Sequence, residues 1–119
     1  MTATATIDVT AFRRAIESRD ATAQLAGYAA DAELTIVDRD HPPSNPTVLR
    51  GAEQIGALLH DIAARDMTHQ VTDLMAAPDR MSFVERCRYA DGTAVLCATV
   101  ATLRDGLITH QLAVQAWDG

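Results

Sequence analysis

The chain has 119 residues, a formal net charge of −6, and apolar residues that make up 48% of the sequence. It contains no lysine and its ten arginines are scattered, which argues against a surface that binds nucleic-acid phosphates. No stretch approaches the roughly 18 apolar residues of a membrane span, and residues 1–6 (MTATAT) do not have the basic residues and apolar run that are typical of a signal peptide. We therefore expect a cytoplasmic protein of one domain, residues 1–119, with residues 1–7 frayed.

The first half of the sequence favours helices. Asp8 is a suitable N-cap for a first helix and Asp20 for a second, which would run from Ala21 to about Tyr28. A third helix is predicted from Gly51 to about Arg65, where apolar residues recur three and four positions apart. These residues are Ile55, Leu58, Leu59 and Ile62.

Two strands are predicted between and after these helices. In residues 32–38, alternation places Leu34, Ile36 and Asp38 on one face, so that a carboxylate ends an apolar row. The three prolines of residues 39–46 indicate a loop. After the third helix, one face of a further strand would carry His69, Val71, Asp73 and Met75.

The second half predicts an antiparallel meander. Three apolar-alternating runs, residues 82–90, 94–104 and 107–117, are joined by Asp91-Gly92 and Asp105-Gly106. Asp-Gly supplies the positive φ that tight hairpins require. Helices followed by a curved sheet predict an α+β cone that can enclose a pocket, and an interior with only five aromatic residues leaves room for one.

The alternation of side chains also predicts which face of each strand is buried. Over residues 82–89 the row with Phe83, Glu85, Cys87 and Tyr89 is the better core, so Glu85 would point inward. On the last strand, periodicity favours Ile108 and every second residue to Ala116 as the inner row. Strands 94–104 and 107–117 each carry buriable residues on both faces, more than one layer of helices can cover, which suggests a homodimer.

Metal and covalent chemistry are not expected from local motifs. The four histidines lie in four different elements, and none has the partner spacing of a zinc site. Gly-rich phosphate loops and nucleophile elbows are missing from the sequence. Cys87 and Cys97 are interpreted as free thiols in the core, with a disulfide as the alternative if the first hairpin sets them opposite each other.

Several segments, in order, carry a family resemblance: Phe12–Ile16 (FRRAI), Tyr28–Ala32 (YAADA), Arg50–Ile55 (RGAEQI), His69–Asp73 (HQVTD), Tyr89–Gly92 (YADG) and Leu103–Ile108 (LRDGLI). Together they resemble the SnoaL-like polyketide cyclase family of the nuclear transport factor 2-like superfamily, from about residue 8 to 118. The resemblance implies a cone of bent antiparallel sheet closed by three helices of the N-terminal half, often dimeric through the outer sheet face. Its members include isomerases, cyclases, hydratases and binding proteins without catalysis.

The resemblance also bears on the site. Ketosteroid isomerases of this superfamily use a Tyr and two Asp side chains, and the corresponding positions here are Phe12, Ile36 and Thr99. That particular mechanism is therefore not expected. The same alignment turns Gln111 and Gln115 toward the pocket, against the periodicity of the last strand, and we follow the alignment.

We therefore expect a pocket for a small apolar or polyketide-like molecule. As an enzyme it would be a cofactor-free acid/base isomerase, cyclase or hydratase, with Asp38 as base and His69 as its proton partner. Desolvation would raise the pKa of Asp38, and a nearby His69 would lower it again. The predicted substrate-binding residues are Tyr28, Glu85, Thr99, Gln111, Gln115 and Trp117. The alternative is a non-catalytic ligand-binding or interaction module of the same fold.

Overall fold

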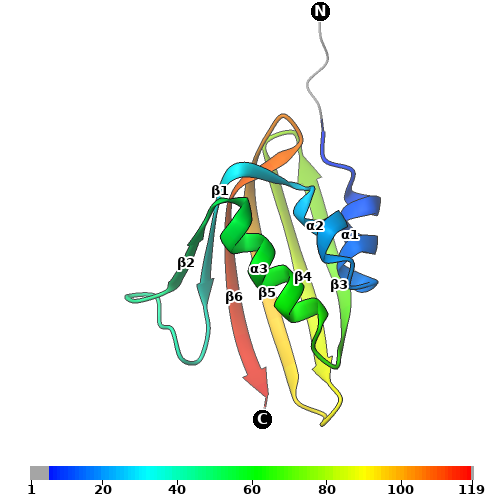
Figure 1. The fold of residues 1–119 in the computed structure, drawn as a ribbon, viewed down its shortest axis with the longest axis vertical. Helices are drawn as coiled ribbons and strands as arrows, with labels where there is room; N and C mark the ends of the chain where they lie inside the picture. The colour runs from blue at the N-terminus through cyan, green and yellow to red at the C-terminus, as the bar shows by residue number, and fades with distance from the viewer. Residues whose placement is uncertain (1–5, 119) are drawn as a thin grey trace, which may run out of the picture.

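The computed structural model describes residues 6–118, which form an α+β fold with a curved six-stranded sheet and helices on one of its faces (Figure 1). The helices are α1 (Val9–Glu17), α2 (Ala21–Leu25) and α3 (Gly51–Ala63). The strands are β1 (Tyr28–Val37), β2 (Thr47–Arg50), β3 (Met67–Ala77), β4 (Arg80–Tyr89), β5 (Ala94–Arg104) and β6 (Leu107–Asp118). Of the segment predicted to be frayed, residues 1–5 lie outside the described residues, whereas Ile7 packs against the core.

The sheet order is β2-β1-β6-β5-β4-β3. Strands β3 to β6 pair antiparallel in sequence, which confirms the predicted meander and adds β3 to it. The expectation of a wholly antiparallel sheet is wrong, because β1 pairs with β6 in parallel. The short strand β2, which follows the proline loop, was not predicted and forms the outer edge beside β1.

Side-chain caps start the first two helices as predicted. The Asp8 carboxylate accepts from the backbone N–H of Ala11 at 3.0 Å, and Asp20 accepts from that of Ala23 at the same distance. The second helix is shorter than expected and ends at Leu25. Tyr28 begins β1 instead, because the chain has already turned there to pair with β6.

The two hairpins set the register of the meander. Asp105 and Gly106 both have positive φ, 52° and 76°, which matches the tight turn predicted from their sequence. The other hairpin has a longer loop, residues 90–93, so Cys87 pairs with Val95 and Cys97 pairs with Glu85. The hairpin therefore does not set the two cysteines opposite each other, the alternative that would have allowed a disulfide, and both are free.

A β-bulge changes the faces of β3. Asp73 has a left-handed φ of 54°, and the pairing with β4 shifts between Thr72 and Met75. The extra residue reverses the alternation, so Leu74 packs toward the core and Met75 is 71% exposed. The expected single face of β3 therefore holds for His69 and Val71 only.

A second bulge explains why periodicity and the family alignment predict opposite inner faces for β6. Leu103 pairs with Ile108, but Thr102 pairs with His110, so one extra residue lies in β6 at Thr109. Ile108 is fully buried before this bulge, and Gln111 is buried after it. The periodicity interpretation of β6 is wrong beyond residue 108, and the alignment-based orientation of Gln111 and Gln115 is correct.

The core lies between the helices and the inner sheet face. Phe12 of α1 packs edge-on against Phe83 of β4, with ring centroids 5.9 Å apart. Ile55 of α3 is fully buried, whereas Leu58 is only half-buried. Within residues 6–118, no helix has both the length and the apolar character needed to cross a membrane.

Replacing Ile55 with Ala is expected to lower the free energy of unfolding by about 2–5 kcal/mol, since a fully buried side chain leaves a cavity. Leu58→Ala is the matched comparison on the same helix and should cost less, because Leu58 borders an existing cavity. Urea unfolding of both variants measures the difference. Equal costs, or a larger one for Leu58, would show that α3 is rotated from the orientation described.

Candidate functional site

A cavity of about 340 Å³ lies between the helices and the inner face of the sheet. Its volume is near the lower end of the range for small-molecule sites, about 300–1,000 Å³. Apolar side chains of β1 and α3 form much of its wall, and polar side chains come from β3, β4 and β6 and from the segments around α2, β1 and the end of α3. The apolar lining includes Ile16, Leu34, Ile36, Leu58, Leu59, Ile62, Met67, Val95 and Ala113.

Seven of the eight predicted site residues line this cavity. They are Tyr28, Asp38, His69, Glu85, Gln111, Gln115 and Trp117. Thr99 does not line it: the side chain is buried and lies 3.8 Å from the Cys97 sulfur through its hydroxyl. The expected pairing of Asp38 with His69 is not formed, since each has other partners.

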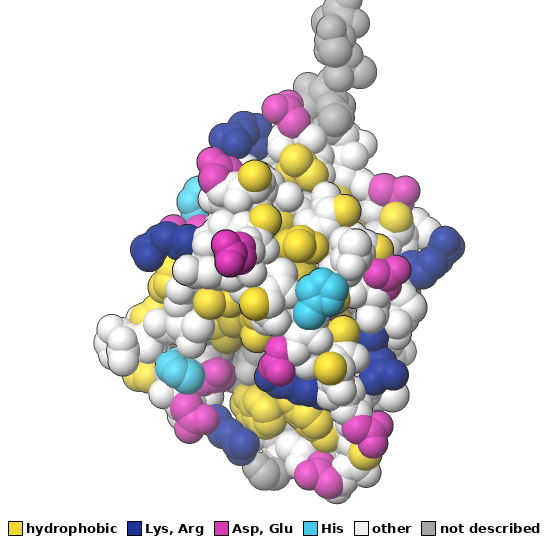
Figure 2. Space-filling model, in the orientation of Figure 1, with side chains coloured by type: hydrophobic (Ala, Val, Ile, Leu, Met, Phe, Trp, Pro, Cys, Tyr) yellow, Lys and Arg dark blue, Asp and Glu magenta, His cyan; other side chains and the backbone are white. Residues whose placement is uncertain are grey.

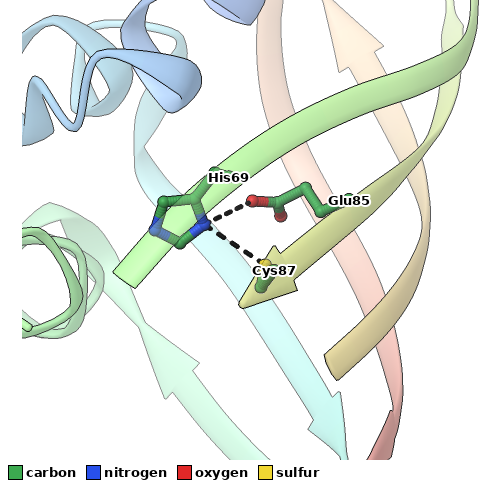
Figure 3. Close-up of side chains that lie close together, drawn as sticks. All are labelled: His69, Glu85 and Cys87. Atoms are coloured by element: carbon green, nitrogen blue, oxygen red, sulfur yellow. Dashed lines mark hydrogen bonds and ion pairs between the residues drawn. The ribbon is translucent and has the colours of Figure 1, made fainter. Parts of the chain in front are cut away.

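His69, Glu85 and Cys87 form a compact cluster on the cavity wall, hereafter the β3–β4 cluster (Figure 3). Glu85 and Cys87 are two residues apart on β4 and so share a face, while His69 pairs directly with Cys87 from β3. His69 Nδ1 lies 3.2 Å from Cys87 Sγ and 3.6 Å from Glu85 Oε1. The side chains of His69 and Glu85 are only 6% and 18% exposed, so their interaction is poorly screened by water.

The two thiols of the cavity are poor nucleophiles. Burial raises the pKa of Cys87 to about 12, and the negative charge of Glu85 contributes to the same effect. Burial, again with Glu85, raises the pKa of Cys97 to about 11. Because the thiolate is the reactive form, neither side chain is prepared for covalent catalysis as the protein stands.

Tyr28 and Gln111 form a buried polar pair across the parallel β1–β6 ladder. The Tyr28 hydroxyl donates to Gln111 Oε1 at 2.5 Å. Burial raises the pKa of Tyr28, and Glu85 adds to this, so the phenol stays protonated and acts as a donor. This bond satisfies the Gln111 carbonyl and fixes the orientation of its amide.

Asp38 lies at the wall of the cavity beside the proline loop. Its carboxylate contacts His41 Nδ1 and accepts from the Asp40 backbone N–H, both at 2.9 Å. Burial raises the pKa of Asp38, but the hydrogen bonds with His41 and Asp40 outweigh it, so the net pKa is lowered. The predicted rise in the pKa of Asp38 is therefore wrong, and the partner is His41 instead of His69.

The aromatic side chains of Tyr89 and Trp117 line the cavity together with Arg65. The rings of Tyr89 and Trp117 stack with centroids 6.0 Å apart, and the guanidinium of Arg39 lies 4.4 Å from the Trp117 ring centroid. Arg65 donates to the Tyr89 hydroxyl at 2.9 Å, and Trp117 Nε1 donates to Gln115 Oε1 at 3.0 Å. Figure 2, which views the molecule from the side of the helices, shows hydrophobic side chains exposed near the C-terminus, next to arginine and acidic side chains.

The sequence interpretation places Cys87 in the core and does not include Arg65 or Gln24 among the site residues, although all three line the cavity. The signal for Cys87 is its position two residues after Glu85 on the predicted inner row. Its contact with His69 depends on the β3–β4 register, which only the structure gives. Chemically, the cavity offers an imidazole beside a carboxylate, an oriented amide and an aromatic end.

Comparisons with known proteins agree with this architecture. A family model described as a SnoaL-like domain matches residues 9–111. A search of curated proteins found no match. Among solved structures, an NTF2-like protein of unknown function from Mesorhizobium loti superposes with a TM-score of 0.78 at 18% identity, covering 91% of this chain and 87% of that one.

Two further structures extend the range of relatives. A candidate ketosteroid isomerase from Kribbella flavida gives a TM-score of 0.74 at 14% identity, covering 91% of this chain and 74% of that one. A SnoaL-like protein of unknown function from Burkholderia thailandensis gives 0.65 at 24% identity, covering 92% and 90%. The family match over residues 9–111 shows that the chain belongs to the SnoaL-like family, and its fold is shared with NTF2-like proteins of known structure.

Proposed function

We propose that the cavity binds a small, mostly apolar molecule with a carbonyl group and that His69 acts on it as a cofactor-free general base. The observation that carries this proposal is the contact between His69 Nδ1 and the Glu85 carboxylate on the wall of a cavity of about 340 Å³. An apolar lining with a few convergent polar groups is typical of small-molecule sites. The Kribbella protein named as a candidate ketosteroid isomerase supports carbonyl chemistry as the starting point.

The proposed proton transfer follows from the position of the imidazole. Glu85 and Cys87 Sγ both lie on the Nδ1 side of His69, and this favours the tautomer that carries its proton on Nδ1. In Figure 3 the Nε2 atom points away from β4. Nε2 then takes a proton from the carbon next to the carbonyl group, and the Glu85 carboxylate stabilises the resulting imidazolium.

The developing enolate oxygen needs a hydrogen-bond donor. We assign this role to the side-chain amide of Gln111, whose carbonyl oxygen is already occupied by the Tyr28 hydroxyl. An oriented donor in a dry site stabilises the transition state more than a donor in water does. Return of the proton from Nε2 to a different carbon would complete an isomerisation.

Asp38, which the sequence suggested as the base, fits a supporting role better. Its lowered pKa makes it a weak base, and its carboxylate is held by His41 and the Asp40 backbone. We propose that this pair fixes the start of the proline loop, residues 39–46, which connects two residues of the cavity wall, Asp38 and Thr47. The base function is therefore assigned to His69 alone.

We also propose that the protein is a homodimer through the outer face of the sheet, which the helices leave open. Large apolar side chains are exposed there, with Val100 at 55% and Leu112 at 40%. This face forms a broad trough of about 650 Å³ that includes Met75 as well. Burying such a patch against a second copy removes apolar area from water.

The base assignment predicts proton exchange at carbon. In deuterium oxide, the metal-free protein should accelerate exchange of the protons next to the carbonyl of a bicyclic aryl ketone, observed by proton NMR. His69→Gln should reduce this acceleration by at least about a hundredfold, whereas Asp38→Asn should reduce it by less than about tenfold. Wild-type exchange that survives His69→Gln would refute the assignment. Ketone binding without any exchange would favour the non-catalytic binding module.

The Asp38–His41 pair predicts a pH-dependent contribution to stability. A carboxyl group whose pKa is lowered by folding stabilises the native state above its unfolded pKa, about 3.9, and this contribution is lost as the pH falls through the folded pKa. Asp38→Asn should therefore destabilise the protein near pH 7 and make little difference near pH 2. Urea unfolding at both pH values measures this. A difference that stays constant down to pH 2 would mean that the ionised carboxylate is not involved.

The dimer predicts a mass of two chains in sedimentation at micromolar concentration. Val100→Glu should give a monomer with an unchanged fold by circular dichroism, because a charge in the middle of an apolar interface is left unpaired. Arg104→Glu on the same strand, also exposed but at its end, is the matched control and should stay dimeric. A monomeric wild type would contradict the proposed interface.

A further inference from the structure

The β3–β4 cluster brings together three kinds of metal ligand. An imidazole, a carboxylate and a thiol lie with their ligand atoms all within 4.8 Å of one another on the cavity wall. We propose that His69, Glu85 and Cys87 bind a single zinc-like divalent cation, with the remaining coordination position open to the cavity. This cation site goes beyond the proposed acid/base function and does not require turnover.

The geometry of the cluster is close to that of a tetrahedral site. With zinc bond lengths of about 2.0–2.3 Å, tetrahedral angles place pairs of ligand atoms about 3.4–3.6 Å apart. The observed separations from His69 Nδ1 are 3.2 Å to Cys87 Sγ and 3.6 Å to Glu85 Oε1. The third separation, between Cys87 Sγ and the Glu85 carboxylate, is no more than 4.8 Å. Side-chain rotations of about an ångström or less would therefore bring the three ligand atoms to tetrahedral spacing.

The donor set also selects the type of cation. One nitrogen, one sulfur and one oxygen ligand suit zinc and similar transition metals, whereas calcium and magnesium prefer oxygen ligands throughout. The thiolate and the carboxylate together neutralise a divalent charge. Without a cation, Glu85 and a Cys87 thiolate would repel each other in a site that is poorly screened. A cation removes this repulsion and takes the place of the thiol proton.

Three protein ligands leave one tetrahedral position for water or for an oxygen atom of a bound molecule, as in catalytic zinc sites. The cluster lines the cavity, so that position is reached from the pocket. A cation on His69 Nδ1 also replaces the proton that the acid/base proposal places there. Metal binding and general-base catalysis by His69 are therefore expected to compete.

Cys97 provides a matched control within the same cavity. It is the other thiol of the chain, it lines the cavity, and it pairs with Glu85 across β4 and β5. Its sulfur lies 3.8 Å from the Thr99 hydroxyl, and it is not a member of the cluster. A general preference of metal ions for thiols would involve both cysteines, whereas the proposed site requires only Cys87.

The test is a titration of the chelator-treated protein with Co²⁺ and Zn²⁺ in the absence of any organic ligand. Wild type should bind one Co²⁺ per chain and develop a thiolate-to-cobalt charge-transfer band that Zn²⁺ abolishes by displacement. Cys87→Ser should lose the band and weaken binding at least tenfold, and Glu85→Gln should weaken it similarly while keeping a thiolate ligand. Cys97→Ser should retain both the band and the wild-type affinity.

X-ray absorption of the zinc-loaded wild type gives a result that does not depend on any variant being folded. One sulfur and two or three nitrogen or oxygen neighbours are expected. The proposal is overturned if the wild type binds neither ion at millimolar concentration, if no sulfur is found, or if Cys97→Ser loses the band and Cys87→Ser keeps it. Failure of the carbon-exchange experiment leaves this result intact, because that experiment uses metal-free protein.

Discussion

The antiparallel pairing of β3 with β4 determines where the chemistry of this protein can take place. It sets His69 opposite Cys87 and next to Glu85, three residues that come from strands joined by a short turn. Met67, His69 and Val71 keep this face turned inward until the bulge at Asp73 reverses the alternation. Without that register the imidazole would have no carboxylate partner, and the cavity would lack its candidate base.

The cavity remains open because part of the inner sheet face carries polar side chains and is covered by only a short layer of helices. The inner sheet face ends in polar side chains toward the C-terminus of β6, and the helical layer above it is short, with α2 only five residues long. Polar groups on a buried face are costly unless they are paired. Here Tyr28 pairs with Gln111, and Gln115 pairs with Trp117, so the wall is both polar and fixed. Such a wall can orient a carbonyl group without reorganising when a ligand binds.

The sequence predicts correctly those features that depend on the preferences of a few neighbouring residues. The caps at Asp8 and Asp20 and the turn at Asp105-Gly106 follow from side-chain or backbone preferences of the residues themselves. The bulges at Asp73 and Thr109 do not follow from such preferences. Apolar residues continue in the same phase past each bulge in the sequence, at Met75 and Leu112, although the inserted residue turns these side chains to the outer face. Two other features depend on how separate strands pair. The parallel pairing of β1 with β6 joins segments that are far apart in the sequence, and the contact of His69 with Cys87 depends on the register of β3 against β4. For the same reason, a search for short histidine spacings could not detect the β3–β4 cluster.

We propose that Glu85, 3.6 Å from His69 Nδ1, holds the imidazole with its proton on Nδ1 and leaves Nε2, which points away from β4 (Figure 3), as the base. Nitrogen-15 NMR of the imidazole side chains in the metal-free protein near pH 8 tests this most directly, with His69 assigned by comparison with His69→Gln. We expect the His69 Nε2 signal at the chemical shift of an unprotonated nitrogen and the Nδ1 signal at that of a protonated one. A His69 in the opposite tautomer, with its proton on Nε2, would contradict the account.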